Sequence, residues 1–222
     1  MQFRKLELLP TLFFIASFVV LCALGTWQLQ RLAWKESIIA ASEARRHLPI
    51  LAGLPEDTGD LVYRKAALTG RFLYDHTIHL IGRQQGMNVG YYMVTPFALD
   101  DDGRVILVNR GFSPLGKETK PAGLVTVSGV FRPLRQKRYF APENVPEKNI
   151  WTYEDLDKIG EMVGQRPLPL VLEVIGQQEK NVFPIPDDGK IIFQNNHLGY
   201  AITWFALAVT SVVMFGAYYR KK

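Results

Sequence analysis

His197 is the residue whose type and position most clearly suggest chemistry. It opens the segment HLGYAITWF (residues 197–205), the start of an uncharged apolar stretch that continues to residue 219. A histidine at the edge of a bilayer costs less free energy than one at its centre, yet it can still reach a ligand among the lipid chains. If the segment is helical, one stripe carries His197, Tyr200, Ala201 and Trp204. Such a stripe could hold a flat apolar ring system and ligate its iron through the imidazole.

A plainer interpretation makes His197 an interfacial side chain that hydrogen-bonds to Asn195 or Asn196. Spacing alone leaves both interpretations open. They differ in whether a ring nitrogen remains available to a ligand.

Arg31 is the second candidate, because Trp27, Arg31 and Trp34 share a face at helical spacing. One interpretation is an aromatic belt at the membrane surface with an arginine that reaches toward the headgroups. The other is that Arg31 pairs with an anionic group held at that level, such as the propionates of a haem, because a guanidinium fork suits carboxylates.

Two apolar segments must position these residues, at 8–30 and 198–219. About 20 helical residues cross the hydrocarbon core of a bilayer, so each segment is long enough to span it. We therefore expect membrane helices at 8–30 and 197–219, tails at 1–7 and 220–222, and a domain at 31–196 between them. A cleaved signal peptide ending at the small residues 23–25 is an alternative, although the apolar core is longer than is usual for one.

The excess of positive charge lies beside the membrane segments. Residues 31–196 carry 21 Lys and Arg against 20 Asp and Glu, whereas the remainder carries 5 basic residues and 1 acidic residue. This placement predicts that both termini are cytoplasmic, that the domain is periplasmic and that the membrane lipid is a partner, and it argues against nucleic-acid binding. No Arg/Ser-rich leader precedes the first segment, which favours a bacterial inner membrane.

The middle of the chain has the pattern of a β-rich domain. Short apolar or alternating runs predict strands at 65–73, 77–81, 91–99, 105–108, 124–131 and 170–175, and the run DDDG (residues 100–103) predicts a hairpin turn. A helix is expected after Thr152, which with Asp155 resembles a capping box. With a single cysteine, no intramolecular disulfide can form. The expected fold class is α+β: two transmembrane helices flanking a β-rich, antiparallel barrel or sandwich with one or two helices.

Several short motifs favour ordinary structure over catalysis. Residues 111–118 nearly match a phosphate-binding loop, but Glu118 replaces the required hydroxyl, so we expect a polar loop. The three aspartates at 100–102 lack the spacing of a calcium loop. His76 and His79, placed on one strand, would point to opposite faces. No nucleophile or zinc motif occurs in the sequence, so we do not expect an enzyme.

Four motifs along nearly the whole chain resemble the surfeit locus protein 1 family, the cytochrome c oxidase assembly factors of bacteria and mitochondria. They are GxWQxxRxxxK (residues 25–35), GY and TP (90–91 and 95–96), VNRG (108–111) and NNHLxYAxTWF (195–205). Phe112 stands where the family often has tryptophan. Gly199 replaces a larger polar residue.

The resemblance implies a factor that supports haem a insertion into subunit I of the oxidase, with His197 as the haem ligand. Subunit I would be the partner, and haem a synthase a further one. Tyr200 and Trp204 would flank the ring, and Arg31 would neutralise a propionate. Two other classes stay open: a structural chaperone of an oxidase intermediate that binds no haem, and a membrane-anchored periplasmic enzyme using Arg110, Glu154 and Asp155.

Overall fold

The computed structural model describes residues 7–81, 90–114, 117–137, 139–177, 179, 182–187 and 195–220. The chain divides into two compact units, one made of residues 1–41 and 192–222 and the other of residues 42–191. Each unit is described by itself. The basic residues expected to anchor the termini at positions 4, 5, 221 and 222 lie outside the described residues.

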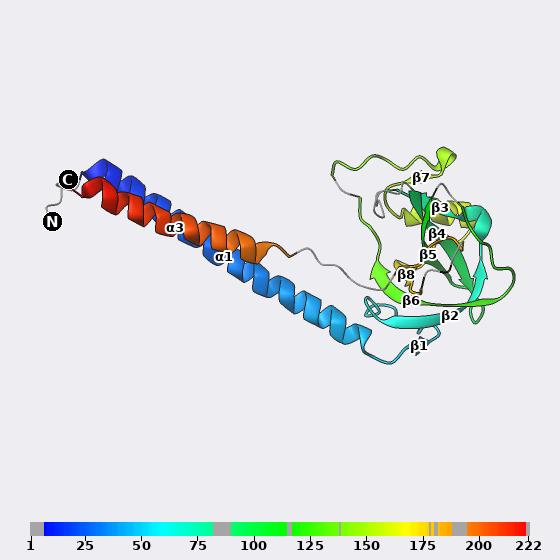
Figure 1. Cartoon of the computed structure of the whole chain (residues 1–222). Helices are drawn as coiled ribbons and strands as arrows, with labels where there is room; N and C mark the ends of the chain where they lie inside the picture. The colour runs from blue at the N-terminus through cyan, green and yellow to red at the C-terminus, as the bar shows by residue number, and fades with distance from the viewer. Residues whose placement is uncertain are drawn as a thin grey trace. The chain divides into compact units, whose positions relative to one another are not determined.

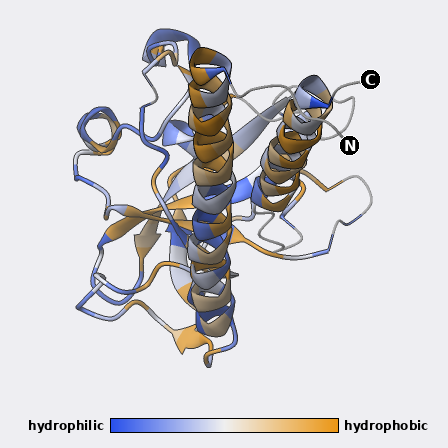
Figure 2. Cartoon of the chain, turned by 90° about the vertical axis from the view of Figure 1, so that its left-hand side faces the viewer, coloured by the Kyte–Doolittle hydropathy of each residue, from blue (hydrophilic) through white to orange (hydrophobic). Residues whose placement is uncertain are grey.

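The first unit is built from two long apolar helices, α1 (Leu8–Arg46) and α3 (His197–Tyr219). Both are long and apolar enough to cross a membrane, which confirms the two predicted membrane-capable helices. At 1.5 Å per residue, α1 is about 58 Å long, well beyond the roughly 30 Å of a bilayer core. The apolar colouring in Figure 2 accordingly covers α3 and one half of α1, and the other half of α1 is mixed.

The two helices run side by side and antiparallel, with contacts at both ends (Figure 1). Phe14 stacks on Phe215 with 4.1 Å between ring centroids, and the Tyr219 hydroxyl lies 3.2 Å from the backbone nitrogen of Glu7. Near the other end, the Phe205 ring fills the space beside Gly25, where a Cβ would come within 2.7 Å of it. Helices in lipid usually associate through close packing at small residues and through a small number of interhelical hydrogen bonds.

The second unit contains a mixed sheet. Its strands in the described residues are β1 (Leu51–Ala52), β2 (Lys65–Phe72), β3 (Ile78–Leu80), β4 (Gly90–Leu99), β5 (Val105–Pro114), β6 (Val125–Pro133), β7 (Ile150–Trp151) and β8 (Leu170–Val174). The order is β1-β2-β6-β8-β5-β4-β3-β7, and β2 also pairs with β4. The pairings therefore link β2, β6, β8, β5 and β4 in a closed ring, which leaves few free edges.

Gly70 is the point at which β2 changes partner. It pairs with Val125 of β6 and with Leu99 of β4. The carbonyl oxygen of Ala98 lies 2.2 Å from where a Cβ of residue 70 would be. Only glycine allows this approach, so the ring closes at a residue without a side chain.

Two apolar clusters lie on opposite faces of the central strands. The inner cluster takes residues from all five strands of the ring, among them Leu68, Phe97, Ile106, Phe131 and Leu172. The outer cluster takes the alternate residues of β4, β5 and β8 and joins them to β3, β7 and α2 (Leu156–Val163), as in Leu107, Val171, Trp151 and Ile159. Both faces of β5 and β8 are therefore buried, which explains why their sequences are continuously apolar.

The predicted strands and the hairpin are present, with differences at their ends. Leu99 and Arg104 close the hairpin through a 2.9 Å backbone bond, and Gly103 adopts a positive φ of 69°. The expectation of a purely antiparallel sheet is wrong, because β5 and β8 are parallel, as are β1 and β2 and also β3 and β7. The two-residue strands β1 and β7 and the extension of β5 to Pro114 were not predicted.

The cap of α2 also differs from the prediction. Asp155, not Thr152, is the N-cap, and its carboxylate accepts a hydrogen bond from the Lys158 backbone nitrogen at 3.3 Å. The Thr152 hydroxyl instead donates to the carbonyl oxygen of Pro142. Gly164 ends the helix in the left-handed conformation, as a C-terminal glycine commonly does.

Candidate functional site

His197 is the first residue of α3 and is half-buried. Its Nδ1 lies 2.7 Å from the Oε1 atom of Gln28, a residue of α1 whose exposed fraction is 9%. The contact of the plainer interpretation, to Asn195 or Asn196, is thus replaced by one that joins the two helices. A partly buried polar pair between two apolar helices favours one register, because either group without the other would lack this partner.

The contact with Gln28 determines which ring nitrogen of His197 can act as a ligand. With the amide oxygen as acceptor, Nδ1 carries the proton and Nε2 carries the lone pair. Histidines that bind metals usually donate the opposite N–H to such an oxygen, which fixes the tautomer and the orientation of the ring. In that tautomer, Nε2 is the ring nitrogen that could bind a metal.

The other predicted site residues, Tyr200, Trp204 and Arg31, differ in how far their side chains are exposed to solvent. Tyr200 is 56% exposed, whereas Trp204 is half-buried. Arg31 follows Gln28 by one helical turn, is exposed, and stacks its guanidinium 4.3 Å from the centroid of the Trp34 ring. Arg31 thus lies about one turn of α1 beyond the residue that contacts His197, and the observed stacking matches the aromatic-belt interpretation.

The residue types around His197 fit a haem group, but the packing between the two helices restricts where one could lie. The imidazole offers one nitrogen with a lone pair, and the surrounding surface is apolar and aromatic, as a porphyrin requires. The space beside Gly25 is already filled by the Phe205 ring, so a planar ligand could not lie between the helices there. It would have to approach from an exposed side of the helix pair.

Gln28 is the residue of the candidate site that sequence reasoning did not single out. It was considered only as part of the segment 8–30 and of the motif at 25–35. The available signal was an amide side chain near the end of the apolar segment, one turn before Arg31. Polar residues within membrane helices usually face another helix and have a partner there.

A second constellation surrounds Arg110 in the β unit. The motif at 108–111 contains a β-bulge, because Tyr92 pairs with Phe112 but Val94 pairs with Asn109. Gly111 has a φ of +117°, and a Cβ there would lie 1.9 Å from the carbonyl oxygen of Ile185. The bulge thus needs glycine and re-aims the side chain before it.

Arg110 is 7% exposed and lies within a network of rings and charges. Its Nη1 donates to Glu118 at 2.8 Å, and its Nη2 donates to the carbonyl oxygen of Thr119. The guanidinium carbon lies 5.1 Å from the Phe72 ring centroid and 4.9 Å from that of Tyr74. Burial raises the pKa of the Tyr74 hydroxyl, an effect that the charge of Arg110 opposes.

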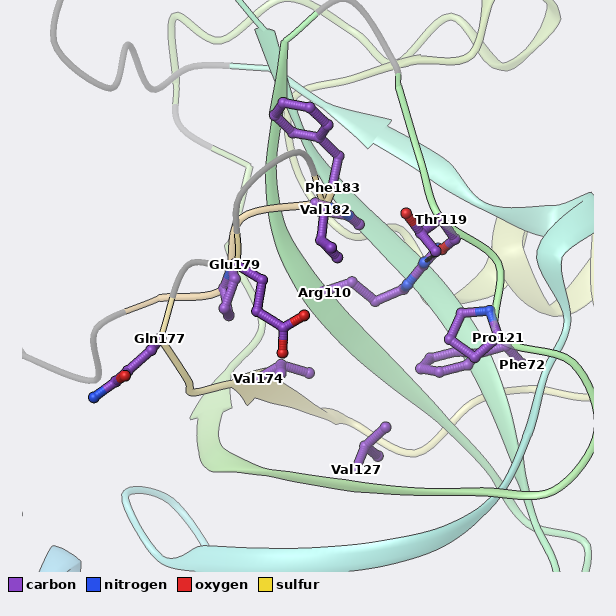
Figure 3. Close-up of a pocket in the computed structure, with 12 residues that line it drawn as sticks. Phe72, Arg110, Thr119, Pro121, Val127, Val174, Gln177, Glu179, Val182 and Phe183 are labelled. Carbon is purple, nitrogen blue, oxygen red and sulfur yellow. Dashed lines mark hydrogen bonds between the residues drawn. The ribbon is translucent and has the colours of Figure 1, made fainter.

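Arg110 forms part of the wall of a pocket of about 250 Å³, shown in Figure 3. The other walls are mainly apolar and include Val127, Val174, Val182 and Pro186. The volume is below the roughly 300–1,000 Å³ of ligand pockets, so the pocket does not offer a cofactor-sized site. Since Glu118 neutralises Arg110, this constellation mainly holds the end of β5 to the following loop. The expected polar loop at 111–118 therefore begins as strand, and positions 115 and 116 lie outside the described residues.

The remaining sequence candidates do not assemble a metal site in the described part of the chain. No group of three histidine, cysteine or acidic side chains with metal-binding proximity occurs there. His76 ends the 3₁₀ helix η1 (Tyr74–His76), whereas His79 lies on β3 and stacks on Tyr91, so the two do not share a strand. Asp102 accepts hydrogen bonds from Arg104 in the hairpin turn.

Comparisons with known proteins agree with the motifs. The model of the SURF1 family matches residues 15–209, a range that includes Gln28, Arg110 and His197. The chain is similar to Surfeit locus protein 1 of Rattus norvegicus, with 33% identity over 223 residues that cover 89% of this chain and 72% of the rat protein. It is also similar to the SURF1-like protein of Rickettsia bellii, with 33% identity over 222 residues that cover 93% of this chain and 89% of that protein.

Proposed function

This chain belongs to the SURF1 family, and we propose that it serves the assembly of haem-copper cytochrome c oxidase by holding haem a for subunit I. The site would be the exposed side of the α1 and α3 pair at His197. The protein would lie in a bacterial inner membrane with both termini in the cytoplasm and the β unit in the periplasm. Haem a synthase would supply the cofactor, and subunit I would receive it.

The observation that carries the proposal is the 2.7 Å contact between His197 Nδ1 and Gln28 Oε1. It explains why a half-buried imidazole stands at the end of a membrane helix, and it leaves Nε2 available. Histidines that ligate metals commonly donate the opposite ring N–H to an oxygen in this way.

Each residue of the site would have one task. His197 would ligate the iron through Nε2, and Gln28 would keep the proton on Nδ1. Tyr200 and Trp204 would contact the ring, and Arg31 would leave Trp34 to pair with a propionate. The haem would supply its redox and oxygen chemistry only in the oxidase, so retention and orientation are the work of this chain.

The first test is optical spectroscopy of the full chain purified in detergent after loading with haem a. We expect a Soret band that His197→Ala removes and that His79→Ala, a histidine of the β unit, leaves unchanged. An unchanged band in His197→Ala would contradict ligation by this residue.

A structural chaperone without haem remains the second candidate, and the Phe205 ring in the space beside Gly25 favours it. In that case the His197 and Gln28 pair would only lock the two helices. A colourless protein that co-purifies with subunit I, and continues to do so as His197→Asn, would support this candidate.

The enzyme hypothesis has less support, because its proposed residues have structural tasks. Glu154 accepts hydrogen bonds from Arg132 at 2.7 Å and from the Arg135 backbone nitrogen at 2.6 Å, and Asp155 caps α2. Alanine at these positions would lower stability whether or not the protein is an enzyme. Activity and unfolding must therefore be measured on the same variants.

A further inference from the structure

The loop after β6 carries two large aromatic side chains almost completely in the open. Tyr139 is 93% exposed and Phe140 is 92% exposed, and their rings meet edge to face with 4.8 Å between centroids. Leaving two such rings in water forgoes the favourable free energy of burying them. An adjacent exposed pair of this size indicates a contact surface.

The charges around the pair are mostly positive. The sequence between residues 135 and 143 carries three basic residues and one acidic residue. Lys137 is about half exposed and pairs with Glu143 at the surface, which raises the pKa of the lysine. Such a surface pair is weak and exchanges readily for another anion.

The pair fits a lipid surface better than a protein. In chain order, the nearest large exposed apolar side chains in the described residues are Leu124 and Met162. Tyr139 and Phe140 lie at a turn of this loop, and two rings alone cover far less than the roughly 800 Å² that a protein partner needs on each side. A bilayer interface accepts an isolated aromatic tip flanked by cations, because it needs no complementary shape.

We propose that Tyr139 and Phe140 insert their rings at the headgroup level of an anionic phospholipid bilayer. The basic residues around them would pair with lipid phosphates on that surface. Two apolar helices flank the β unit in the chain, so a bilayer that they span is always within reach at high effective concentration. This contact would orient the β unit on the membrane, and it does not depend on haem binding.

The test places a nitroxide label on the full chain, in a Cys22→Ala background that removes the native thiol. Phe140→Cys carries the label at the tip, and Leu124→Cys, an exposed position on another loop, is the matched control. The chain is reconstituted into vesicles of phosphatidylcholine alone or with about a quarter phosphatidylglycerol. Collision rates with oxygen and with a water-soluble nickel chelate then report the depth of each label.

In the anionic vesicles we expect the label at position 140 to collide several-fold more with oxygen relative to nickel than the label at 124. Neutral vesicles and high salt should reduce this difference, since the cations contribute to binding. A label at 140 that stays accessible to nickel in anionic vesicles would overturn the proposal. Protection that appears only when oxidase subunits are added would assign the loop to a protein partner instead.

Discussion

The helix pair and the β unit are each stabilised by a different kind of internal contact. In the β unit, two apolar clusters fill both faces of β5 and β8, and residues such as Trp151 and Ile159 are completely buried. In the helix pair, few side chains are buried, among them Ala201, Ala208 and Tyr219, and the contacts near the helix ends include polar ones. Stability is thus concentrated in one unit, whereas the candidate chemistry lies in the other.

The largest loss of unfolding free energy is expected from Trp151→Ala in the β unit. The ring is 0% exposed and its Nε1 donates to Asn149 Oδ1 at 3.0 Å. Removing a buried large aromatic costs about 3–5 kcal/mol, and the amide would lose one of its partners as well. Chemical unfolding of the full chain in detergent measures the loss. The control Tyr139→Ala, at an exposed site, should change the free energy by less than about 0.5 kcal/mol.

A smaller loss is expected from Gly111→Ala. The left-handed backbone opposes any side chain, and so does the Ile185 oxygen, which would lie 1.9 Å from the added Cβ. We therefore expect a loss of about 3 kcal/mol, which thermal unfolding measures. Gly103→Ala, also at a positive φ but with open space around the Cβ position, is the matched control. Equal losses in the two variants would show that the bulge contact with Ile185 carries no weight.

In the helix pair, Gln28→Leu should barely change stability. Polar contacts between membrane helices average about 0.6 kcal/mol, so we expect a loss of that order. Its effect on the haem spectrum should be much larger, because Nδ1 of His197 would lose the acceptor that fixes the tautomer. Gln30→Leu, a second amide on the same helix that is exposed, should alter neither. If Gln28→Leu lowered the free energy of unfolding as much as Trp151→Ala does, stability would not be concentrated in the β unit.

The smallest effect concerns pH. Burial lowers the pKa of His79 below its usual 6.5, an effect that the charge of Glu118 opposes. Because the folded state binds fewer protons at this site, its contribution to stability is complete above pH 6.5 and declines as the pH falls through the lowered pKa. Unfolding free energies from about pH 7.5 to about pH 5 should therefore fall slightly less in His79→Gln than in the parent chain. A steeper fall in the variant would reverse the assigned direction.

The sequence predicted the elements whose pattern is local. The run at 105–108 is apolar throughout, and the two membrane-capable helices are long and uncharged. The end of β5 was missed because Asn109, Arg110 and Gly111 resemble a loop, and because Ile185, which pairs with Phe112, lies far along the chain. Asp155 replaced Thr152 as the cap because the Thr152 hydroxyl donates to Pro142.

The candidate site was predictable only in part. His197 stood out by its place at the end of an apolar segment. Its contact with Gln28 joins positions 169 residues apart in the chain, and no periodicity within either helix shows which faces meet. Tertiary contacts between helices are set by packing, so a sequence pattern indicates the candidate residue but not its partner.

The bulge at Arg110 and Gly111 also determines which face of β5 the following residues occupy. Leu107 and Phe112 are an odd number of positions apart, yet both belong to the outer cluster. Strict alternation would send them to opposite sides, but the additional residue shifts the phase of the strand by one. Without the bulge, strict alternation over the same residues would turn Phe112 toward the opposite face, so the additional residue is what keeps this ring in the outer cluster.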